Sequence, residues 1–398
     1  MSATIKKDYR ADRIKNVPPY LFARIDELKE KAQARGIDII SFGIGDPDQP
    51  TPTFIVDAMH NAINDPKNHD YPPYDGTMEF RTAVAAWYKK RFNVDIDPKT
   101  ETIALIGSKE GIAHTFWALV NPGDVCLLPD PGYPVYNTAS LFSGGENYFF
   151  PLSPKRNWLP DLSAIPSDVA KKAKLIFVNY PNNPTGATCD LKFFAELVEF
   201  AKKYDIVICN DNAYSETTFD GYTAPSILQV PGAKDISLEF TSLSKTFNMT
   251  GWRSGMVAGS ADLVGALRII KTNVDSGIFK AIQKASVVAL GSDHTATSGI
   301  NAVYEKRRDM MVAGLNNLGW NLSKPKGTFY IWAPIPARYA TSADFCADMI
   351  EKCGIVVVPG NGYGANGEGY FRVAITVSEA RIAEGLARMQ TAGMTFQK

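Results

Sequence analysis

The segment from Thr241 to Gly255, TSLSKTFNMTGWRSG, concentrates the reactive side chains of this sequence. It contains two hydroxyls, one amine and one guanidinium, on Ser242, Ser244, Lys245 and Arg253. Hydroxyls and a guanidinium can together coordinate one phosphate, which leaves the amine free to react with a carbonyl attached to that phosphate. This is the chemistry of pyridoxal 5′-phosphate (PLP) held on a lysine as a Schiff base. The simpler alternative is a polar loop with one solvated lysine.

PLP needs a carboxylate beside its ring nitrogen, because that nitrogen must stay protonated to withdraw electrons from the reacting carbon. Asp211 is the candidate, since it follows the strand pattern IVIC, and α/β sites form at the carboxyl ends of strands. Tyr214 and Asn183, the latter in the segment YPNNPTG, are placed to reach the phenolic oxygen of the same ring. The alternatives are a turn or helix cap for Asp211 and a plain turn for Asn183.

A phosphate also favours the N-terminus of a helix. Gly107-Ser-Lys-Glu-Gly111 follows the strand pattern TIALI and precedes a helical pattern, so the amides of Ser108 and Lys109 are expected to face an anion. Such turns are common in α/β proteins, and this one is weak by itself. Tyr133, which follows another strand pattern, is placed to stack on a flat ring, with a plain aromatic core residue as the alternative.

An amino-acid substrate needs its α-carboxylate held in a fixed geometry, which a guanidinium does better than an ammonium. Arg372 lies in the otherwise apolar run GYFRVA and therefore requires a partner. The alternative is an arginine on an edge strand that points to solvent.

The elements that position these side chains alternate short apolar runs with longer helical patterns. Runs bounded by turn residues predict buried strands at residues 102–106, 125–129, 175–179, 206–210 and 255–259. Residues 191–204 keep apolar side chains at helical spacing, as expected of a crossover helix between parallel strands. This alternation predicts an α/β fold.

The C-terminal part of the chain predicts a second, smaller α+β lobe. Helical patterns lie at residues 298–318 and 342–353, and strand patterns lie at residues 328–333, 355–358 and 370–374. We therefore predict a large domain over residues 46–290 and a small domain formed by residues 1–45 and 291–398.

Composition and charge exclude several classes of function. The chain has 398 residues with 42 Lys and Arg against 42 Asp and Glu, so it lacks the basic surface that nucleic-acid or membrane binding favours. Five scattered cysteines without a CxxC pair and four histidines without ligand spacing indicate neither a disulfide framework nor a metal site. No apolar h-region opens the sequence, and no apolar stretch long enough to cross a membrane occurs. We expect a cytoplasmic protein with small-molecule partners.

Taken together, these motifs resemble the aspartate-aminotransferase superfamily of PLP enzymes over nearly the whole chain. The matching segments occur in the family's order: Tyr71-Pro-Pro-Tyr-Asp-Gly76, Gly107-Ser-Lys-Glu-Gly111, Asn183-Pro-Thr-Gly186, Asp211-x-x-Tyr214, Ser242-x-Ser-Lys245, Gly251-x-Arg253 and Tyr370-Phe-Arg372. The resemblance implies PLP-dependent transferase fold type I, with a mostly parallel seven-stranded sheet in the large domain.

The resemblance also implies a role for each residue. Lys245 would carry the Schiff base and move the proton, Asp211 would pair with the ring nitrogen, and Asn183 and Tyr214 would bind the phenolic oxygen. The remaining cofactor contacts would come from Ser108, Lys109, Ser242, Ser244 and Arg253 at the phosphate and from Tyr133 on the ring. Arg372 would clamp the substrate carboxylate, and Asn183 would also contact the substrate. In this family Tyr71 reaches the phosphate of the neighbouring subunit, which implies a homodimer with shared active sites.

Within the superfamily, several stretches are similar to those of LL-diaminopimelate aminotransferases, which serve lysine biosynthesis. They are Val17-Pro-Pro-Tyr-Leu-Phe22, Phe42-Gly-Ile-Gly-Asp-Pro-Asp48, the segment from Ser242 to Arg253, and Asn273-Val-Asp-Ser-Gly-Ile-Phe279. In that branch, residues matching Tyr20 and Gly45 line the substrate pocket, and residues 273–276 touch the distal end of the partner's substrate.

One position departs from that branch. Tyr74 stands where the plant-type enzymes have a glutamate that binds the distal ammonium, so other groups must recognise it here. Alanine aminotransferases, which share a close form of YTAPSILQV at residues 222–230, are the alternative. A regulator that binds PLP without turnover would need a basic DNA-binding segment, which this sequence does not offer.

Overall fold

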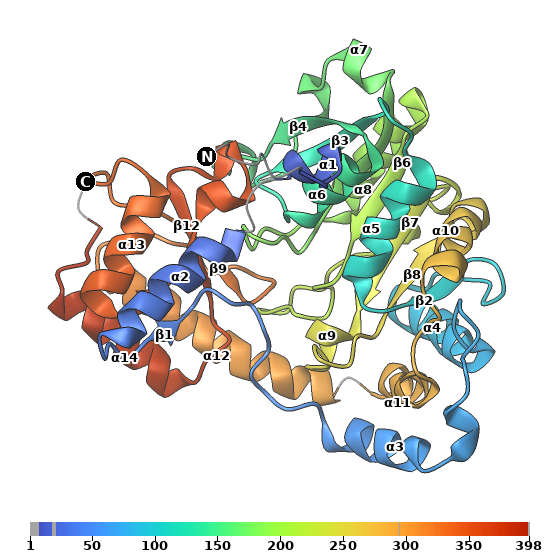
Figure 1. The fold of residues 1–398 in the computed structure, drawn as a ribbon, viewed down its shortest axis with the longest axis horizontal. Helices are drawn as coiled ribbons and strands as arrows, with labels where there is room; N and C mark the ends of the chain where they lie inside the picture. Colours follow the sequence, from blue (N-terminus) through green and yellow to red (C-terminus); the bar gives the residue numbers. More distant parts are fainter. Residues whose placement is uncertain (1–7, 18–20, 294, 397–398) are drawn as a thin grey trace, which may run out of the picture.

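A seven-stranded sheet forms the centre of the larger part of the molecule. The computed structural model describes residues 8–17, 21–293 and 295–396 (Figure 1). The strands lie in the order β2-β8-β7-β6-β5-β3-β4. Their bounds are β2 (Thr102–Leu105), β3 (Val125–Asp130), β4 (Glu146–Pro151), β5 (Ala173–Val178), β6 (Val207–Asp211), β7 (Ser237–Ser242) and β8 (Gly255–Gly259). Strand β8 runs antiparallel to both of its neighbours, and the other pairings are parallel. The prediction of a mostly parallel sheet is confirmed.

Successive residues of the central strands point to opposite faces of this sheet. On β5, Ile176 and Val178 join one hydrophobic cluster, while Leu175 and Phe177 join another. The first cluster packs against α4 (Met78–Phe92), α8 (Leu191–Tyr204) and α11 (Lys280–Gly291); the second packs against α5 (Ser108–Leu119), α6 (Val135–Ser143) and α10 (Ala261–Val274). Because both faces are covered by helices, the strands read as continuous apolar runs.

The crossover helix α8 occupies the predicted residues. The Asp190 side chain accepts the Phe193 amide at 2.9 Å, which caps the first turn. At the other end Asp205 takes a left-handed conformation with φ 57°, which terminates the helix. The remaining helices of this part are α3 (Thr53–Ile63), α7 (Ser167–Ala170) and α9 (Leu243–Thr246).

The predicted α+β lobe forms around a second sheet and a long helix. Its elements are α12 (Thr295–Asn317), β9 (Tyr330–Pro334), α13 (Ser342–Cys353), β10 (Ile355–Val356), β11 (Val358–Pro359), β12 (Tyr370–Ala374) and α14 (Glu379–Thr391). Strands β11, β12 and β9 form an antiparallel sheet, and β10 pairs with β1 (Ile40–Ser41). Figure 1 shows α2 (Leu21–Ala34), in blue, among these orange and red elements, whereas α1 (Asp12–Lys15) contacts α6.

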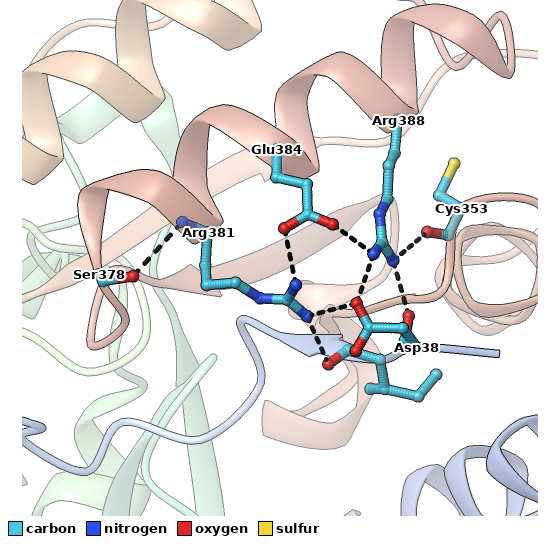
Figure 2. A network of polar contacts seen from close by, with 7 residues as sticks. Asp38, Cys353, Ser378, Arg381, Glu384 and Arg388 are labelled. Carbon is cyan, nitrogen blue, oxygen red and sulfur yellow. Dashed lines mark hydrogen bonds and ion pairs between the residues drawn. The ribbon is translucent and has the colours of Figure 1, made fainter. Parts of the chain in front are cut away.

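A network of charges joins the segment before β1 to the C-terminal helix (Figure 2). The Asp38 carboxylate lies 2.9 Å from the guanidinium of Arg381 and 2.5 Å from that of Arg388. Arg388 also donates to the Asp38 carbonyl at 2.6 Å. Hydrogen bonding to the two guanidiniums lowers the pKa of Asp38. The ends of the small lobe, far apart in sequence, are thus held together by directed contacts.

The sequence prediction missed two strands of the large sheet, β4 and β7. It also predicted one strand at residues 355–358, where the structure has two. Edge strand β4 is half-exposed, and β7 carries Glu239 within it, so neither forms a long apolar run. Glu239 is fully buried and accepts hydrogen bonds from Asn210, Ile227, Ser226 and Tyr88. The predicted strand at residues 355–358 is wrong as one unit, because the chain changes its partner from β1 to β12 at Val357.

We propose domain limits at residues 46–290 for the large domain and at residues 1–45 with 291–398 for the small one. The seven-stranded sheet falls within the first range, and both smaller sheets fall within the second. In the described part of the chain, no helix is both long enough and apolar enough to cross a membrane.

Candidate active site

A cavity of about 520 Å³ lies at the carboxyl ends of the parallel strands, between the large sheet and the small lobe. Most of the predicted site residues line it: Gly45, Ser108, Lys109, Tyr133, Asn183, Asp211, Tyr214, Ser242, Ser244, Lys245, Arg253 and Arg372. These residues come from segments spread over more than three hundred positions, and the fold brings them to one place.

Lys245 lies on α9, the single helical turn that follows β7. The Ser242 hydroxyl accepts the Ser244 amide at 3.2 Å and caps this turn. The Lys245 Nζ donates to the Gly45 carbonyl at 3.2 Å. Burial, with smaller contributions from Arg253 and Arg372, lowers the pKa of Lys245 to about 8. The lowered pKa leaves more of this amine uncharged near neutral pH than in a solvated lysine, as a nucleophilic lysine requires.

Asp211 ends β6 and points toward the same cavity. Its Oδ2 accepts the Tyr136 hydroxyl at 2.7 Å. Burial raises the pKa of this carboxyl to about 6, although the Tyr136 hydrogen bond opposes the shift. Sequence reasoning passed over Tyr136, which lies in the same PGYPVY segment as Tyr133, because nothing local relates it to Asp211.

Arg372 reaches the cavity from β12 of the small lobe. It is 3% exposed and donates to the Asn183 Oδ1 at 2.9 Å and to the Gly43 carbonyl at 2.6 Å. Its Nε is buried without a hydrogen-bond partner among the described residues. The prediction that this arginine requires a partner is confirmed.

Asn179 supports both Asn183 and Asp211, although the sequence prediction does not include it in the site. Its side-chain oxygen accepts the Asn183 amide at 2.7 Å, and its Nδ2 donates to the Asp211 carbonyl at 2.6 Å. Asn179 therefore ties the end of β5 to the end of β6. Its only signal in the sequence is its place at the end of the predicted strand at residues 175–179.

The other end of the cavity provides groups suited to a phosphate. Helix α5 begins at Ser108 and has no side-chain cap, so its first amides are open to an anion. The Arg253 guanidinium packs on Gly107, where a methyl group would lie 2.4 Å from Nη2. The Ser244 hydroxyl is buried and has no hydrogen-bond partner within the described chain. An anion held here would satisfy these groups, so the donor set fits a phosphorylated cofactor.

Tyr133 and Lys109 line the cavity beside this phosphate-type site. The Lys109 Nζ lies 6.0 Å from the centroid of the Tyr133 ring. Tyr214 lines the cavity at its other side, and its hydroxyl lies 3.1 Å from that of Tyr330 on β9. Tyr330 is a further lining residue that the sequence prediction does not include.

One predicted residue within the described part of the chain does not line this cavity. Tyr71 is 80% exposed on the surface and does not line it. Gly277 packs on the backbone of Tyr74, which places the turn after α10 beside the segment that carries Tyr71. Tyr20 lies outside the described residues.

Comparison with known proteins agrees with this geometry. The family model of class I and II aminotransferases matches residues 37–389, and the chain belongs to this family. It is 55% identical to an LL-diaminopimelate aminotransferase of Moorella thermoacetica over 96% of this chain and 97% of that protein. It is 54% identical to an LL-diaminopimelate aminotransferase of Gloeobacter violaceus over 97% and 99% of the two chains.

Among solved structures, substrate-bound BacF of Bacillus subtilis superimposes with a TM-score of 0.95 at 35% identity, over 98% of this chain and 100% of that one. The fold is that of the fold type I aminotransferases, and enzymes of this family use PLP. The predictions of fold and of an aminotransferase are confirmed.

Proposed function

We propose that this chain is an LL-diaminopimelate aminotransferase. It would interconvert LL-2,6-diaminopimelate and 2-oxoglutarate with tetrahydrodipicolinate and glutamate. Relatives that carry this name are 54–55% identical over at least 96% of the chain. The observation that carries the reaction class is the meeting of the Lys245 amine, the Asp211 carboxyl and the Arg372 guanidinium in one cavity.

We propose that the cavity holds PLP. When bound, PLP supplies an electron sink that stabilises the charge left on the substrate carbon after its proton is removed. The residues proposed to hold it are Ser108, Lys109, Tyr133, Asn183, Asp211, Tyr214, Ser242, Ser244, Lys245 and Arg253. The unsatisfied Ser244 hydroxyl and the uncapped start of α5 support a phosphate at one end.

The protein's own groups then have separate tasks. The Lys245 amine, with its pKa lowered to about 8, can take a proton from one substrate carbon and deliver it to an atom two bonds away. Arg372 offers two parallel N–H groups to a carboxylate, and the Asn183 hydrogen bond fixes their direction. The Asp211 carboxyl, ionised above its pKa of about 6, provides a negative charge for a cation placed beside it.

We further propose a homodimer in which each subunit contributes Tyr71 and residues 273–276 to the partner's site. Tyr71, Ile269 and Val274 are 80%, 65% and 53% exposed, so these apolar side chains are open to a partner surface. A second copy of the chain would cover them. A cytoplasmic location is proposed because all five cysteines are unpaired and buried.

The experiment that tests the substrate measures glutamate formed from 2-oxoglutarate by the PLP-loaded protein. LL-Diaminopimelate, meso-diaminopimelate and L-alanine are supplied separately as amino donors, with the Lys245→Ala variant as the control. Glutamate should form with LL-diaminopimelate and only weakly with the other two donors. Turnover with alanine alone would refute diaminopimelate as the substrate, and no turnover with any amino acid would refute the aminotransferase assignment to this site.

A further inference from the structure

Tyr330 lies at the junction between two proposed site residues that belong to different lobes. It begins β9, and its side chain is 3% exposed. Its hydroxyl lies 3.1 Å from the Tyr214 hydroxyl, and the two rings meet edge to face at 5.7 Å. The Arg372 guanidinium lies over the Tyr330 ring, 4.0 Å from its centroid. One side chain therefore contacts both the proposed cofactor ligand and the proposed substrate clamp.

The two hydroxyls share one hydrogen bond but carry two protons. In the described part of the chain neither hydroxyl has a hydrogen bond other than this one. Since one proton occupies the shared bond, the other can be donated toward the cavity that both residues line. Burial raises the pKa of Tyr214 well above its usual range, so this hydroxyl stays a donor throughout the working pH range.

The position of the Tyr330 hydroxyl is closely determined by its surroundings. A methyl group on Gly45 would lie 2.0 Å from this oxygen, so the hydroxyl occupies the space that the missing side chain leaves. The ring is held from another side by Phe329, at 4.9 Å between centroids. A hydroxyl packed this way has little freedom to turn away from Tyr214.

We propose that Tyr330 is a positioning residue: its hydroxyl donates to the Tyr214 oxygen and so directs the Tyr214 proton into the cavity, while its ring supports the Arg372 guanidinium. This inference rests on the proposed function, in which Tyr214 binds the phenolic oxygen of PLP. A hydroxyl that accepts one hydrogen bond becomes a stronger donor in its next one. Tyr330 would thereby strengthen the hydrogen bond that Tyr214 donates to the phenolic oxygen of PLP. It would also lower the pH at which the PLP-loaded protein titrates.

The hydroxyl is tested by titrating the visible absorbance of the PLP-loaded protein against pH, without substrate. Donation to the phenolic oxygen favours its charged form and lowers the pH midpoint, so Tyr214→Phe should raise the midpoint. Tyr330→Phe should raise it by a smaller amount, between about a tenth and a third of the Tyr214→Phe shift. In the double variant Tyr330→Phe should add nothing further, because the effect passes through Tyr214.

An unchanged midpoint in Tyr330→Phe, or a full additional shift in the double variant, would overturn the relay. A wild-type protein whose absorbance shows no PLP bound to Lys245 would instead overturn the proposed function. The two failures are therefore distinguishable in the same titration.

The ring is tested separately by the binding of glutarate, a dicarboxylate that has no amino group to transfer. Tyr330→Phe keeps the ring and should bind glutarate as the wild type does. Tyr330→Leu removes it and should weaken binding about threefold to tenfold, as expected for the loss of a partly buried cation–π contact. Equal affinity in both variants, with unchanged thermal unfolding midpoints, would refute the supporting role of the ring.

Discussion

The buried Asp211 carboxyl should make the protein without cofactor less stable than an Asp211→Asn variant at neutral pH. The pKa of this carboxyl is raised by burial from 3.8 to about 6. Each unit is worth about 1.36 kcal/mol, so the penalty for ionising Asp211 in the folded chain reaches about 3 kcal/mol above pH 6. Asparagine keeps the Tyr136 hydrogen bond through its carbonyl oxygen but carries no charge to bury.

The sign of the pH dependence follows from proton binding. Between the two pKa values the folded state holds the proton more tightly than the unfolded state, so stability falls as pH rises through this window. The advantage of Asp211→Asn is expected to grow from about 2 kcal/mol at pH 5 to about 3 kcal/mol at pH 7.5, where it levels off. With the cofactor bound, the wild type should be the more stable of the two proteins. The proposed cation at the ring nitrogen would compensate the charge of Asp211, whereas asparagine has no charge to pair with it.

Urea unfolding of the cofactor-free proteins, at equal protein concentration and at both pH values, measures this difference. Glu196→Gln, which removes an exposed carboxylate from α8, is the matched control and should change stability little at either pH. An advantage of Asp211→Asn that is no larger at pH 7.5 than at pH 5 would refute the reasoning. So would tighter PLP binding by Asp211→Asn than by the wild type.

Three further predictions concern the cavity. Lys245→Ala should abolish amino transfer, because Lys245 supplies the only amine on the capped turn α9. The far-ultraviolet circular dichroism should stay unchanged, and appreciable turnover would contradict the assignment. Arg372→Lys should raise KM for the amino acid more than it lowers kcat, since an ammonium cannot donate two parallel hydrogen bonds, and an unchanged KM would mean that another residue holds the carboxylate. Gly45→Ala should lower the free energy of unfolding by about 1–3 kcal/mol in urea titrations and should weaken amino-acid binding, because the added methyl would lie 2.0 Å from the Tyr330 hydroxyl. A stability equal to that of the wild type would show that Tyr330 moves aside freely.

A second charged cluster shows how the proposed partner-facing segment is held. Lys271, fully buried on α10, lies 3.0 Å from Asp275 and 3.5 Å from Glu110. Asp275 in turn accepts the Gly277 amide at 2.7 Å. The Glu110 carboxylate also lies 2.6 Å from Nδ1 of His114. The Lys271 ammonium therefore supplies a positive charge close to the carboxylates of Glu110 and Asp275 and to the His114 ring. The turn after α10 is thereby tied to helix α5, whose N-terminus faces the cavity.

The sequence by itself determined the local elements and their reactive ends. The strand bounds at residues 255–259 and the helix bounds at residues 191–204 follow from apolar periodicity and from the Asp190 cap, which depend only on near neighbours. Since parallel strands carry their sites at their carboxyl ends, the position of Asp211 after the predicted strand at residues 206–210 indicated a site at that edge of the sheet. Lys245 was indicated by the hydroxyls and the arginine beside it in the sequence, because the strand that precedes it was not predicted.

Only the tertiary structure decided which side chains from distant segments complete that site. Tyr136 bonds Asp211 across seventy-five positions, and Tyr330 meets Tyr214 across one hundred and sixteen, so no local pattern relates them. The same holds for Glu239, whose buried carboxyl interrupts the apolar pattern of β7 and is stabilised by donors from three other segments. The pKa values of Lys245 and Asp211 also depend on burial that the whole fold creates. Periodicity along the chain specifies helices and strands, whereas partners and dielectric surroundings are specified by packing in three dimensions.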